Sequence, residues 1–335
     1  MMLQFARAAF LAAIPLASPA LADGLTEKEM TAPGPLGALA GTYLAPQSPQ
    51  AVALILPGSG PTDRNGNGPL GLDTDAYKQL AEALAERGIA TLRADKRGMF
   101  GSAAAISDPN DVTLAAYGRD AIVWAASLAG ETGLPCTWLI GHSEGGLVAL
   151  SAVASDERAF CGVILLATPG RSLAVVLEDQ LTRSLEDDSL RSAADAAIDS
   201  LQRGQRVPED QIPEPLRPML GPQIQGYLID LFSHDPGEMT RRYGGPLMIV
   251  SGGEDLQLDP TDAATLTQAR NDAVTLLLPG MNHVLKEVPP GDKAANLASY
   301  SNPSVPLATG LADAVARFIT RTEDEPFGLA PPTAE

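Results

Sequence analysis

The segment Thr137-Trp-Leu-Ile-Gly-His-Ser-Glu-Gly-Gly146 indicates both the fold and the chemistry expected of this sequence. An apolar run over 137–140 predicts a buried strand, and the residues from 144 to 154 predict a helix. Between them lies the pattern Gly-x-Ser-x-Gly, centred on Ser143. A serine on such a sharp strand-to-helix turn is typical of a catalytic nucleophile, because the strained backbone there tolerates little side-chain bulk.

A nucleophilic serine needs a base to take its proton, and the chain contains three histidines. His142 lies within the turn itself, so its side chain cannot also reach Ser143 as an external base. His234 falls in a helical segment, where we expect a surface or packing role. His283 follows the last expected strand, at the carboxyl edge of the sheet, where the sites of α/β proteins gather. We therefore predict that His283 is the base.

The base needs a carboxylate to orient it, and three candidates follow the strand expected at 247–250. Asp255 lies in the first loop positions and is the predicted partner of His283. Glu254 is adjacent but should point another way, and its longer side chain makes it the alternative. Asp259 precedes a proline and the start of a helix, so it is predicted to cap that helix.

Acyl transfer also needs backbone donors for a developing oxyanion. The segment Leu56-Pro-Gly-Ser-Gly-Pro61 leaves the strand expected at 51–56, and its small residues let the backbone approach a ligand. The N–H of Ser59 is the first choice for one donor, and that of Gly60 is the second. The N–H of Glu144, at the start of the helix, is predicted to be the other donor.

Apolar runs alternate with helical stretches along the chain, which predicts an α/β fold with a mostly parallel sheet covered on both faces. An N-terminal hairpin is expected near 25–31 and 37–44. Further strands are expected at 51–56, 89–94, 137–140, 163–166, 247–250 and 273–278, and helices at 75–87, 114–128, 144–154, 261–270 and 307–320.

This alternation stops between residues 171 and 245, where proline-interrupted helical patterns replace the strands. We predict an inserted helical cap there, because structureless loops of that length are rare. The core then comprises 23–170 and 246–321, and the tail 322–335 is expected to be disordered. The insertion point places the cap over the carboxyl edge of the sheet. Its apolar residues that could face the site are Leu216, Met219, Leu220, Tyr227, Leu228, Leu231 and Phe232.

Residues 1–22 have the features of a signal peptide: one basic residue, a short apolar run and the small-x-small ending Ala20-Leu-Ala22. We expect cleavage near Ala22 and export to the periplasm or the medium. No cysteine stands directly after the cleavage site, so a lipid anchor is not expected. No other stretch reaches about 18 apolar residues without a charge, so no other stable membrane anchor is expected either.

The net charge of −18 disfavours nucleic acid as a partner, because phosphate backbones would repel the chain. Two cysteines and three histidines also disfavour a metal centre. Residues 63–68 match the first half of a calcium loop, but Thr74 stands at the twelfth position, where glutamate is needed. We therefore expect neither a metal nor a cofactor, and interpret 63–68 as a hydrogen-bonded turn.

Several motifs make the chain resemble the α/β-hydrolase superfamily, and more narrowly the bacterial secreted serine esterases. The order Ser, Asp, His is that of the superfamily. The chain departs from the narrower group at Met99-Phe100, where small residues are usual. The shared segments are Pro57–Asn67 (P-G-S-G-x-x-D-R-x-G-N), Asp95–Gly98 (D-K-R-G), the G-H-S-E-G turn and Asn282–Lys286 (N-H-V-L-K).

The resemblance implies an α/β-hydrolase fold with Ser143, Asp255 and His283 as the catalytic triad. Asp95 and Arg97 are expected to lock neighbouring loops through a charge pair, with a role in substrate binding as the alternative. The sequence thus predicts a serine esterase acting on small-molecule acyl esters. A peptidase or thioesterase with the same triad is the alternative enzyme, and a non-catalytic binding protein is the alternative of another class.

In this fold the strands that begin near Cys136 and Cys161 are parallel neighbours. Adjacent strands lie about 4.8 Å apart, within the range that a disulfide can bridge. We therefore predict a disulfide between the two cysteines, with two buried free thiols as the alternative.

Overall fold

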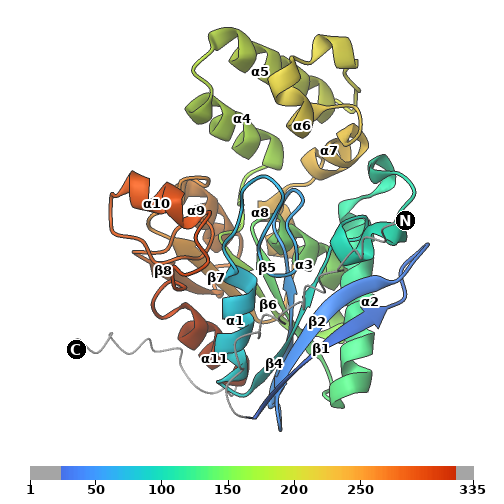
Figure 1. The fold of residues 1–335 in the computed structure, drawn as a ribbon, viewed down its shortest axis with the longest axis vertical. Helices are drawn as coiled ribbons and strands as arrows, with labels where there is room; N and C mark the ends of the chain where they lie inside the picture. The colour runs from blue at the N-terminus through green and yellow to red at the C-terminus, as the bar shows by residue number, and fades with distance from the viewer. Residues whose placement is uncertain (1–23, 322–335) are drawn as a thin grey trace, which may run out of the picture.

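The framework of the structure is an eight-stranded sheet with the order β1-β2-β4-β3-β5-β6-β7-β8 (Figure 1). The computed structural model describes residues 24–321, so the expected signal peptide and tail lie outside the described residues. The strands are β1 (Leu25–Ala32), β2 (Leu39–Pro46), β3 (Ala51–Leu56), β4 (Ile89–Ala94), β5 (Thr137–His142), β6 (Phe160–Leu166), β7 (Leu247–Gly252) and β8 (Val274–Leu278).

Strands β3 to β8 are mutually parallel, while the N-terminal hairpin β1–β2 joins the sheet by antiparallel pairing of β2 with β4. The parallel strands read as continuous apolar runs because helices cover both faces of the sheet. The predicted α/β-hydrolase fold is therefore confirmed, and each predicted strand is present with its ends moved by a few residues.

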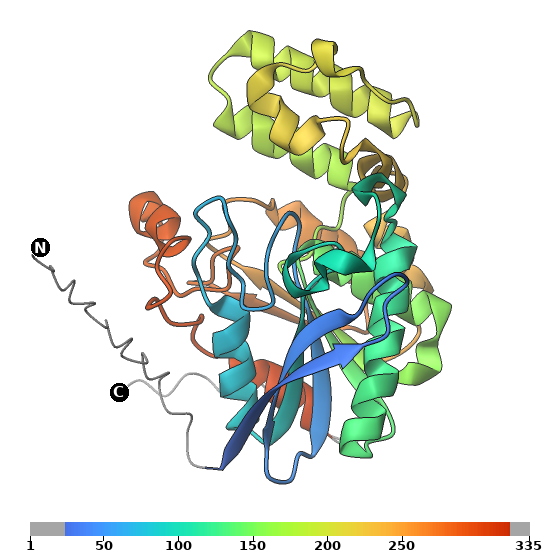
Figure 2. The same ribbon diagram turned by 45° about the vertical axis from the view of Figure 1, so that its right-hand side comes forward.

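Two layers of helices enclose the sheet (Figure 2). Apolar side chains of α1 and α11 pack on one face, and those of α2, α3 and α9 pack on the other. These helices are α1 (Ala76–Ala85), α2 (Leu114–Thr132), α3 (Glu144–Ser155), α9 (Pro260–Ala269) and α11 (Leu311–Thr320).

The remaining helices comprise the insertion between β6 and β7 and several short elements. A helix at 293–299 was not predicted, because this segment lacks an apolar period. These helices are α4 (Leu173–Ser184), α5 (Asp188–Gln202), α6 (Arg217–Leu220), α7 (Gln225–Phe232), α8 (Pro236–Arg242), α10 (Lys293–Ser299) and the 3₁₀ segments Phe100–Ala105, Pro109–Asp111, Glu157–Ala159, Glu209–Gln211 and Glu214–Leu216.

Helices α4–α7, the cap helices, stand over the carboxyl ends of the parallel strands (Figures 1 and 2). They enclose an apolar core of their own, which includes Ile198, Leu216 and Leu220. Helix α8 was expected in the cap but packs against α3 and α9 instead. Its buried face consists of small residues, Gly237 and Thr240, which permit close approach to α9. Within residues 24–321, no helix is both long enough and apolar enough to cross a membrane.

The structure contains the predicted disulfide between Cys136 and Cys161. Cys136 directly precedes β5, and Cys161 is the second residue of β6, the parallel neighbour of β5. Their Cα atoms are 5.3 Å apart, a separation set by the pairing of the two strands. The bond therefore closes a loop of 25 residues that contains the whole strand–turn–helix segment around Ser143.

We predict that replacing Cys136 and Cys161 together by Ala lowers the free energy of unfolding by about 3 kcal/mol, because the unfolded chain regains the entropy of an open loop. Denaturant unfolding of both proteins, monitored by circular dichroism, measures the difference. Adding a reductant should lower the free energy of unfolding of the wild type to nearly that of the variant, and should leave that of the variant unchanged. Equal stability of the two oxidised proteins would contradict the prediction.

Candidate active site

The turn between β5 and α3 holds Ser143 in a conformation that ordinary residues avoid. Its backbone angles are φ +52° and ψ −124°, and its N–H donates to the carbonyl of Leu166 at 2.9 Å. The turn is pressed against the end of β3: a Cβ on Gly145 would lie 2.2 Å from the carbonyl oxygen of Leu56. Glycine is therefore required at position 145, which explains the second glycine of the motif. The strain keeps the Ser143 side chain at the tip of the turn.

The structure brings Ser143, His283 and Asp255 into one hydrogen-bonded line. His283 Nε2 lies 3.2 Å from Ser143 Oγ, and His283 Nδ1 lies 2.9 Å from Oδ2 of Asp255. The aspartate is an acceptor, so Nδ1 carries the proton and Nε2 is free to accept one from the serine. The arrangement is that of a nucleophile, a base and an orienting carboxylate.

Asp255 is held as a carboxylate by its neighbours. Burial alone would raise its pKa, but the neighbouring His283 and the backbone N–H groups of Gln257 and Leu258 lower the pKa below its ordinary value. These two groups donate to Oδ1 at 2.7 and 2.9 Å, leaving Oδ2 for His283. The side chain of Asp255 therefore points inward with both oxygens satisfied.

The other two carboxylates have different partners. Glu254 accepts a hydrogen bond from the N–H of Gly291 at 3.0 Å and so points away from His283. Asp259 caps α9 by accepting from the N–H of Thr261 at 2.9 Å, as its position before a proline predicts.

The loop that carries His283 is fixed by its neighbour Asn282, whose role was not predicted. The side-chain oxygen of Asn282 accepts from the N–H of Lys286 at 2.9 Å. Its amide nitrogen donates to Asn296 and to Ser299, both on α10. The only signal for this role in the sequence is the N-H-V-L-K segment. His234, by contrast, lies on the cap side beside Asp230, 3.6 Å away, and takes no part in the line.

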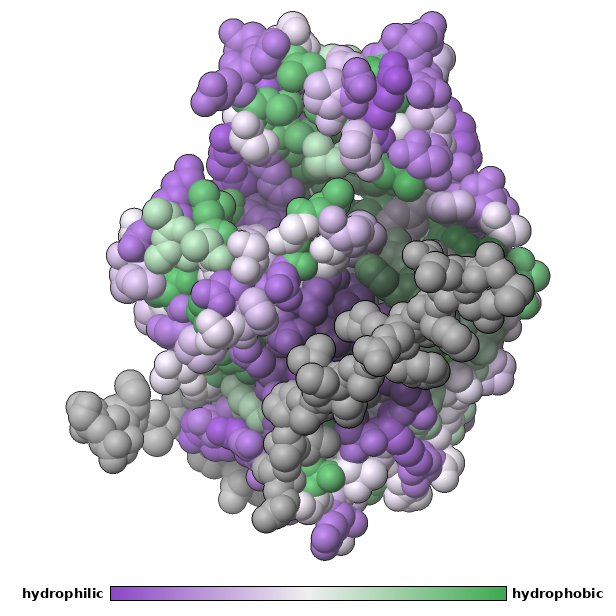
Figure 3. Space-filling view, in the orientation of Figure 1, coloured by the Kyte–Doolittle hydropathy of each residue, from purple (hydrophilic) through white to green (hydrophobic). Residues whose placement is uncertain are grey.

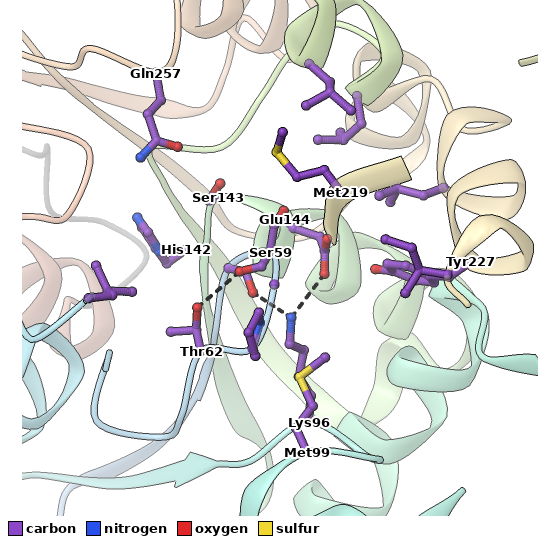
Figure 4. Close-up of a pocket in the computed structure, with 18 of the residues that line it drawn as sticks. Ser59, Thr62, Lys96, Met99, His142, Ser143, Glu144, Met219, Tyr227 and Gln257 are labelled. Carbon is purple, nitrogen blue, oxygen red and sulfur yellow. Dashed lines mark hydrogen bonds and ion pairs between the residues drawn. The ribbon is translucent and has the colours of Figure 1, made fainter. Parts of the chain in front are cut away.

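The loop after β3 passes against the nucleophile. A Cβ on Gly58 would lie 3.2 Å from the Cβ of Ser143, which is closer than an ordinary van der Waals contact. The backbone N–H groups of Ser59, Gly60 and Glu144 have no hydrogen-bond partner within residues 24–321. In Figure 4, Ser59 and Glu144 both lie close to Ser143, on the same side of it. Glu144 also begins α3, whose dipole favours negative charge at this end.

His142 and Tyr77 link this loop to the loop of His283. The Tyr77 hydroxyl accepts from the N–H of Gly58 at 3.0 Å, so its one proton is donated to Nδ1 of His142 at 2.7 Å. Nε2–H of His142 then donates to the carbonyl of His283 at 2.7 Å. Burial, together with the nearby His283, lowers the pKa of His142 to about 3, which keeps the ring neutral. Tyr77 lies on the buried face of α1, and its spacing in the sequence gives no sign of this role.

A cavity of about 540 Å³ lies between the cap helices and the site. Figure 3 shows apolar surface, in green, at the gap between these helices and the body. Of the seven cap residues expected to face the site, Leu216 and Leu220 instead lie in the core of the cap. The lining residues from that set are Met219, Tyr227, Leu228, Leu231 and Phe232.

The structure corrects the expected pairing of Asp95 with Arg97 and shows how the turn at 63–68 is held. Asp95 and Arg97 do not pair with each other: Arg64 donates to Asp95 at 2.8 Å, and Arg97 pairs with Asp120. Asp95 therefore holds the loop that carries Arg64, whereas Arg97 is bonded to Asp120 on helix α2. In the turn at 63–68, Asp63 accepts from the N–H groups of residues 65 and 67 rather than pointing at an ion site. Within residues 24–321 no group of three acidic, histidine or cysteine side chains is arranged to hold a metal.

Comparison with known proteins gives both a family and a relative. Residues 70–202 match the family described as serine aminopeptidase, S33. The chain is 26% identical over 270 residues to Esterase EstD of Thermotoga maritima, and this alignment covers 78% of the chain. The chain spans 61% of the length of that curated relative.

Solved structures show the same fold at low sequence identity. Est1E from Butyrivibrio proteoclasticus aligns with a TM-score of 0.51 and 17% identity, over 81% of this chain and 94% of that one. The thioesterase domain from the curacin biosynthetic pathway aligns with a TM-score of 0.51 and 16% identity, over 88% and 99%. These likenesses show the α/β-hydrolase fold, and the sequence matches support the α/β-hydrolase superfamily.

We predict that Tyr77→Phe lowers the free energy of unfolding by about 1–3 kcal/mol, because the variant leaves the N–H of Gly58 and Nδ1 of His142 buried without a partner. Denaturant unfolding measures the change. Tyr43→Phe is the matched control, since the buried Tyr43 makes no hydroxyl hydrogen bond within residues 24–321 and should lose less than about 0.5 kcal/mol. Equal effects of the two substitutions would show that the Tyr77 hydroxyl does not hold the loops together.

Proposed function

We propose that this member of the α/β-hydrolase superfamily is a serine hydrolase that cleaves small carboxylic esters through an acyl-enzyme intermediate. The observation that carries the proposal is the hydrogen-bonded line from Asp255 through His283 to Ser143. Beside it lie backbone N–H groups that have no hydrogen-bond partner among residues 24–321. Similarity to Esterase EstD supports an ester as substrate.

In the proposed first step, Ser143 Oγ attacks the ester carbonyl carbon while its proton passes to Nε2 of His283, 3.2 Å away. The carbonyl oxygen becomes an oxyanion, which the N–H groups of Ser59 and Glu144 stabilise. His283 then protonates the leaving alcohol, and the acyl group remains on Ser143. In the second step His283 deprotonates a water, which attacks the acyl carbon; the proton then returns to Ser143 and the acid is released.

Asp255 has two tasks in this scheme. By accepting the Nδ1 proton it fixes the tautomer of His283 that leaves Nε2 free. Its negative charge also stabilises the imidazolium that forms when His283 takes the serine proton. The lowered pKa of Asp255 supports this role, because the carboxylate stays charged well below neutral pH.

The match to the serine aminopeptidase family makes an amide bond the second candidate substrate. An aminopeptidase must bind the ammonium group of its substrate near the scissile bond, which calls for an uncompensated carboxylate. The carboxylate nearest the nucleophile in sequence is that of Glu144, and it is already paired with Lys96 at 3.5 Å. This pairing favours a neutral ester over an amino-terminal peptide.

We also infer that the protein works outside the cytoplasm. The signal-peptide pattern over 1–22 motivates this inference. The disulfide between Cys136 and Cys161 supports it, because such bonds persist in oxidising compartments.

We predict that Ser143→Ala reduces the hydrolysis of p-nitrophenyl acetate by about 10⁴-fold or more, because the variant has no nucleophile. Steady-state kinetics on esters, thioesters and aminoacyl amides, with circular dichroism to show that the fold is intact, provide the measurement. A tenth of wild-type activity in the purified variant would refute the assignment. A preference of the wild type for amides would instead favour the peptidase.

We predict that Asp255→Asn lowers kcat by about 10⁴-fold with little change in KM, because the amide neither stabilises the imidazolium nor selects its tautomer. Asp259→Asn is the matched control, the same substitution in the same loop. It should cost little activity, since Asn also caps helices well. An inactive Asp259 variant and an active Asp255 variant would show that Asp255 is not the carboxylate of the triad.

We predict that kcat/KM for p-nitrophenyl esters passes through a maximum at short or medium acyl chains and falls for hexadecanoyl esters, because the cap helices bound a cavity of about 540 Å³. Leu297 is an exposed residue of α10 that does not line this cavity, so Leu297→Ala should leave the profile unchanged. A steady rise of kcat/KM from acetyl to hexadecanoyl esters would contradict the limit set by the cap.

A further inference from the structure

We propose that Lys96 is a positioning residue that holds both oxyanion donors in place, an inference that rests on the proposed role of Ser143. Lys96 lies two residues beyond β4 and is only 8% exposed. Its Nζ donates to the carbonyl of Gly58 at 2.7 Å and lies 3.5 Å from Oε1 of Glu144 (Figure 4). One buried ammonium group thus contacts the two segments that carry the donors.

The contact with Gly58 orients the first donor. The carbonyl of Gly58 and the N–H of Ser59 belong to the same planar trans peptide, so they point in opposite directions. By drawing the carbonyl towards itself, Lys96 turns the Ser59 N–H to the other side of the peptide, where no group in the described part of the chain accepts from it. A positive charge at the carbonyl also polarises the peptide and makes its N–H a stronger donor.

The contact with Glu144 acts on the second donor. The side chain of Glu144 is buried, with 2% of the residue exposed, and a buried carboxylate is costly unless it is paired with a cation. The pairing with Lys96 fixes the residue whose backbone N–H faces the site at the start of α3. The N–H of Gly58 is itself bonded to Tyr77, so the loop after β3 is held on both sides of this residue.

Lys96 lines the cavity, but its ammonium group is already engaged by the protein itself. Its charge is matched by that of Glu144, and its ammonium group also lies 5.9 Å from the ring centre of Tyr117. The contacts of Lys96 are with the protein's own backbone and carboxylate, which distinguishes a positioning role from substrate recognition.

The test is Lys96→Met, which keeps the length of the side chain and removes its charge and donors. The concentration of active enzyme is determined by titrating reactive Ser143 with a fluorophosphonate. Per active site, kcat should fall about 10–100-fold while KM changes less than about threefold. The affinity for a trifluoromethyl ketone, whose adduct with Ser143 carries an oxyanion, should fall by a factor similar to that of kcat/KM. A merely structural role would lower the number of reactive sites and leave both values per site unchanged.

Arg270→Met is the matched control, because Arg270 also donates to backbone carbonyls, those of Tyr243 and Gly245, but far from the site. Its kcat per reactive site should stay within about twofold of the wild type. If Lys96→Met does not fold, Lys96→Leu, which also has neither a charge nor a donor, serves for the same measurements. Wild-type kcat and ketone affinity in either folded Lys96 variant would overturn the proposal. A wild type that the fluorophosphonate does not label would instead refute the serine hydrolase itself.

Discussion

The site depends on one close backbone contact, between the end of β3 and the turn that joins β5 to α3. Strands β3 and β5 are parallel neighbours, so the two segments that follow them leave the sheet at the same edge, within about 5 Å of each other. The fit is so tight that a side chain on Gly145 would collide with the carbonyl of Leu56, and one on Gly58 would press on Ser143. The contact brings the backbone of one loop beside the nucleophile carried by the other.

Buried polar groups hold this contact in place. Gly58 has its N–H bonded to Tyr77 and its carbonyl bonded to Lys96, and neither bond reaches solvent. The chain of hydrogen bonds runs on from Tyr77 to His142, and from His142 to the backbone carbonyl of His283. Three loops from different parts of the chain are therefore linked by hydrogen bonds whose loss would leave buried partners unsatisfied. Such a framework can maintain the strained backbone of Ser143, because the strain is opposed from several sides at once.

The sequence predicts what depends on local order along the chain. Ser143 and its glycines lie within six residues of one another. Asp255 and His283 each follow a strand whose end can be recognised where its apolar run stops. The sequence does not predict partners that depend on the path of loops. Only the folded chain shows that the hydroxyl of Tyr77 joins two loops. For the same reason the partner of Asp95 proved to be Arg64, from a loop about 30 residues earlier.

The account is tested most directly by locating the residue that a fluorophosphonate probe modifies in the folded protein. We expect one adduct per chain, on Ser143, found by mass spectrometry of the digested protein and absent when the chain is unfolded before labelling. The rate of labelling should fall by orders of magnitude in a variant without the His283 imidazole, because the probe reacts with a serine that this base activates. A protein that hydrolyses esters yet carries no adduct on Ser143, or carries it on another residue, would contradict the account.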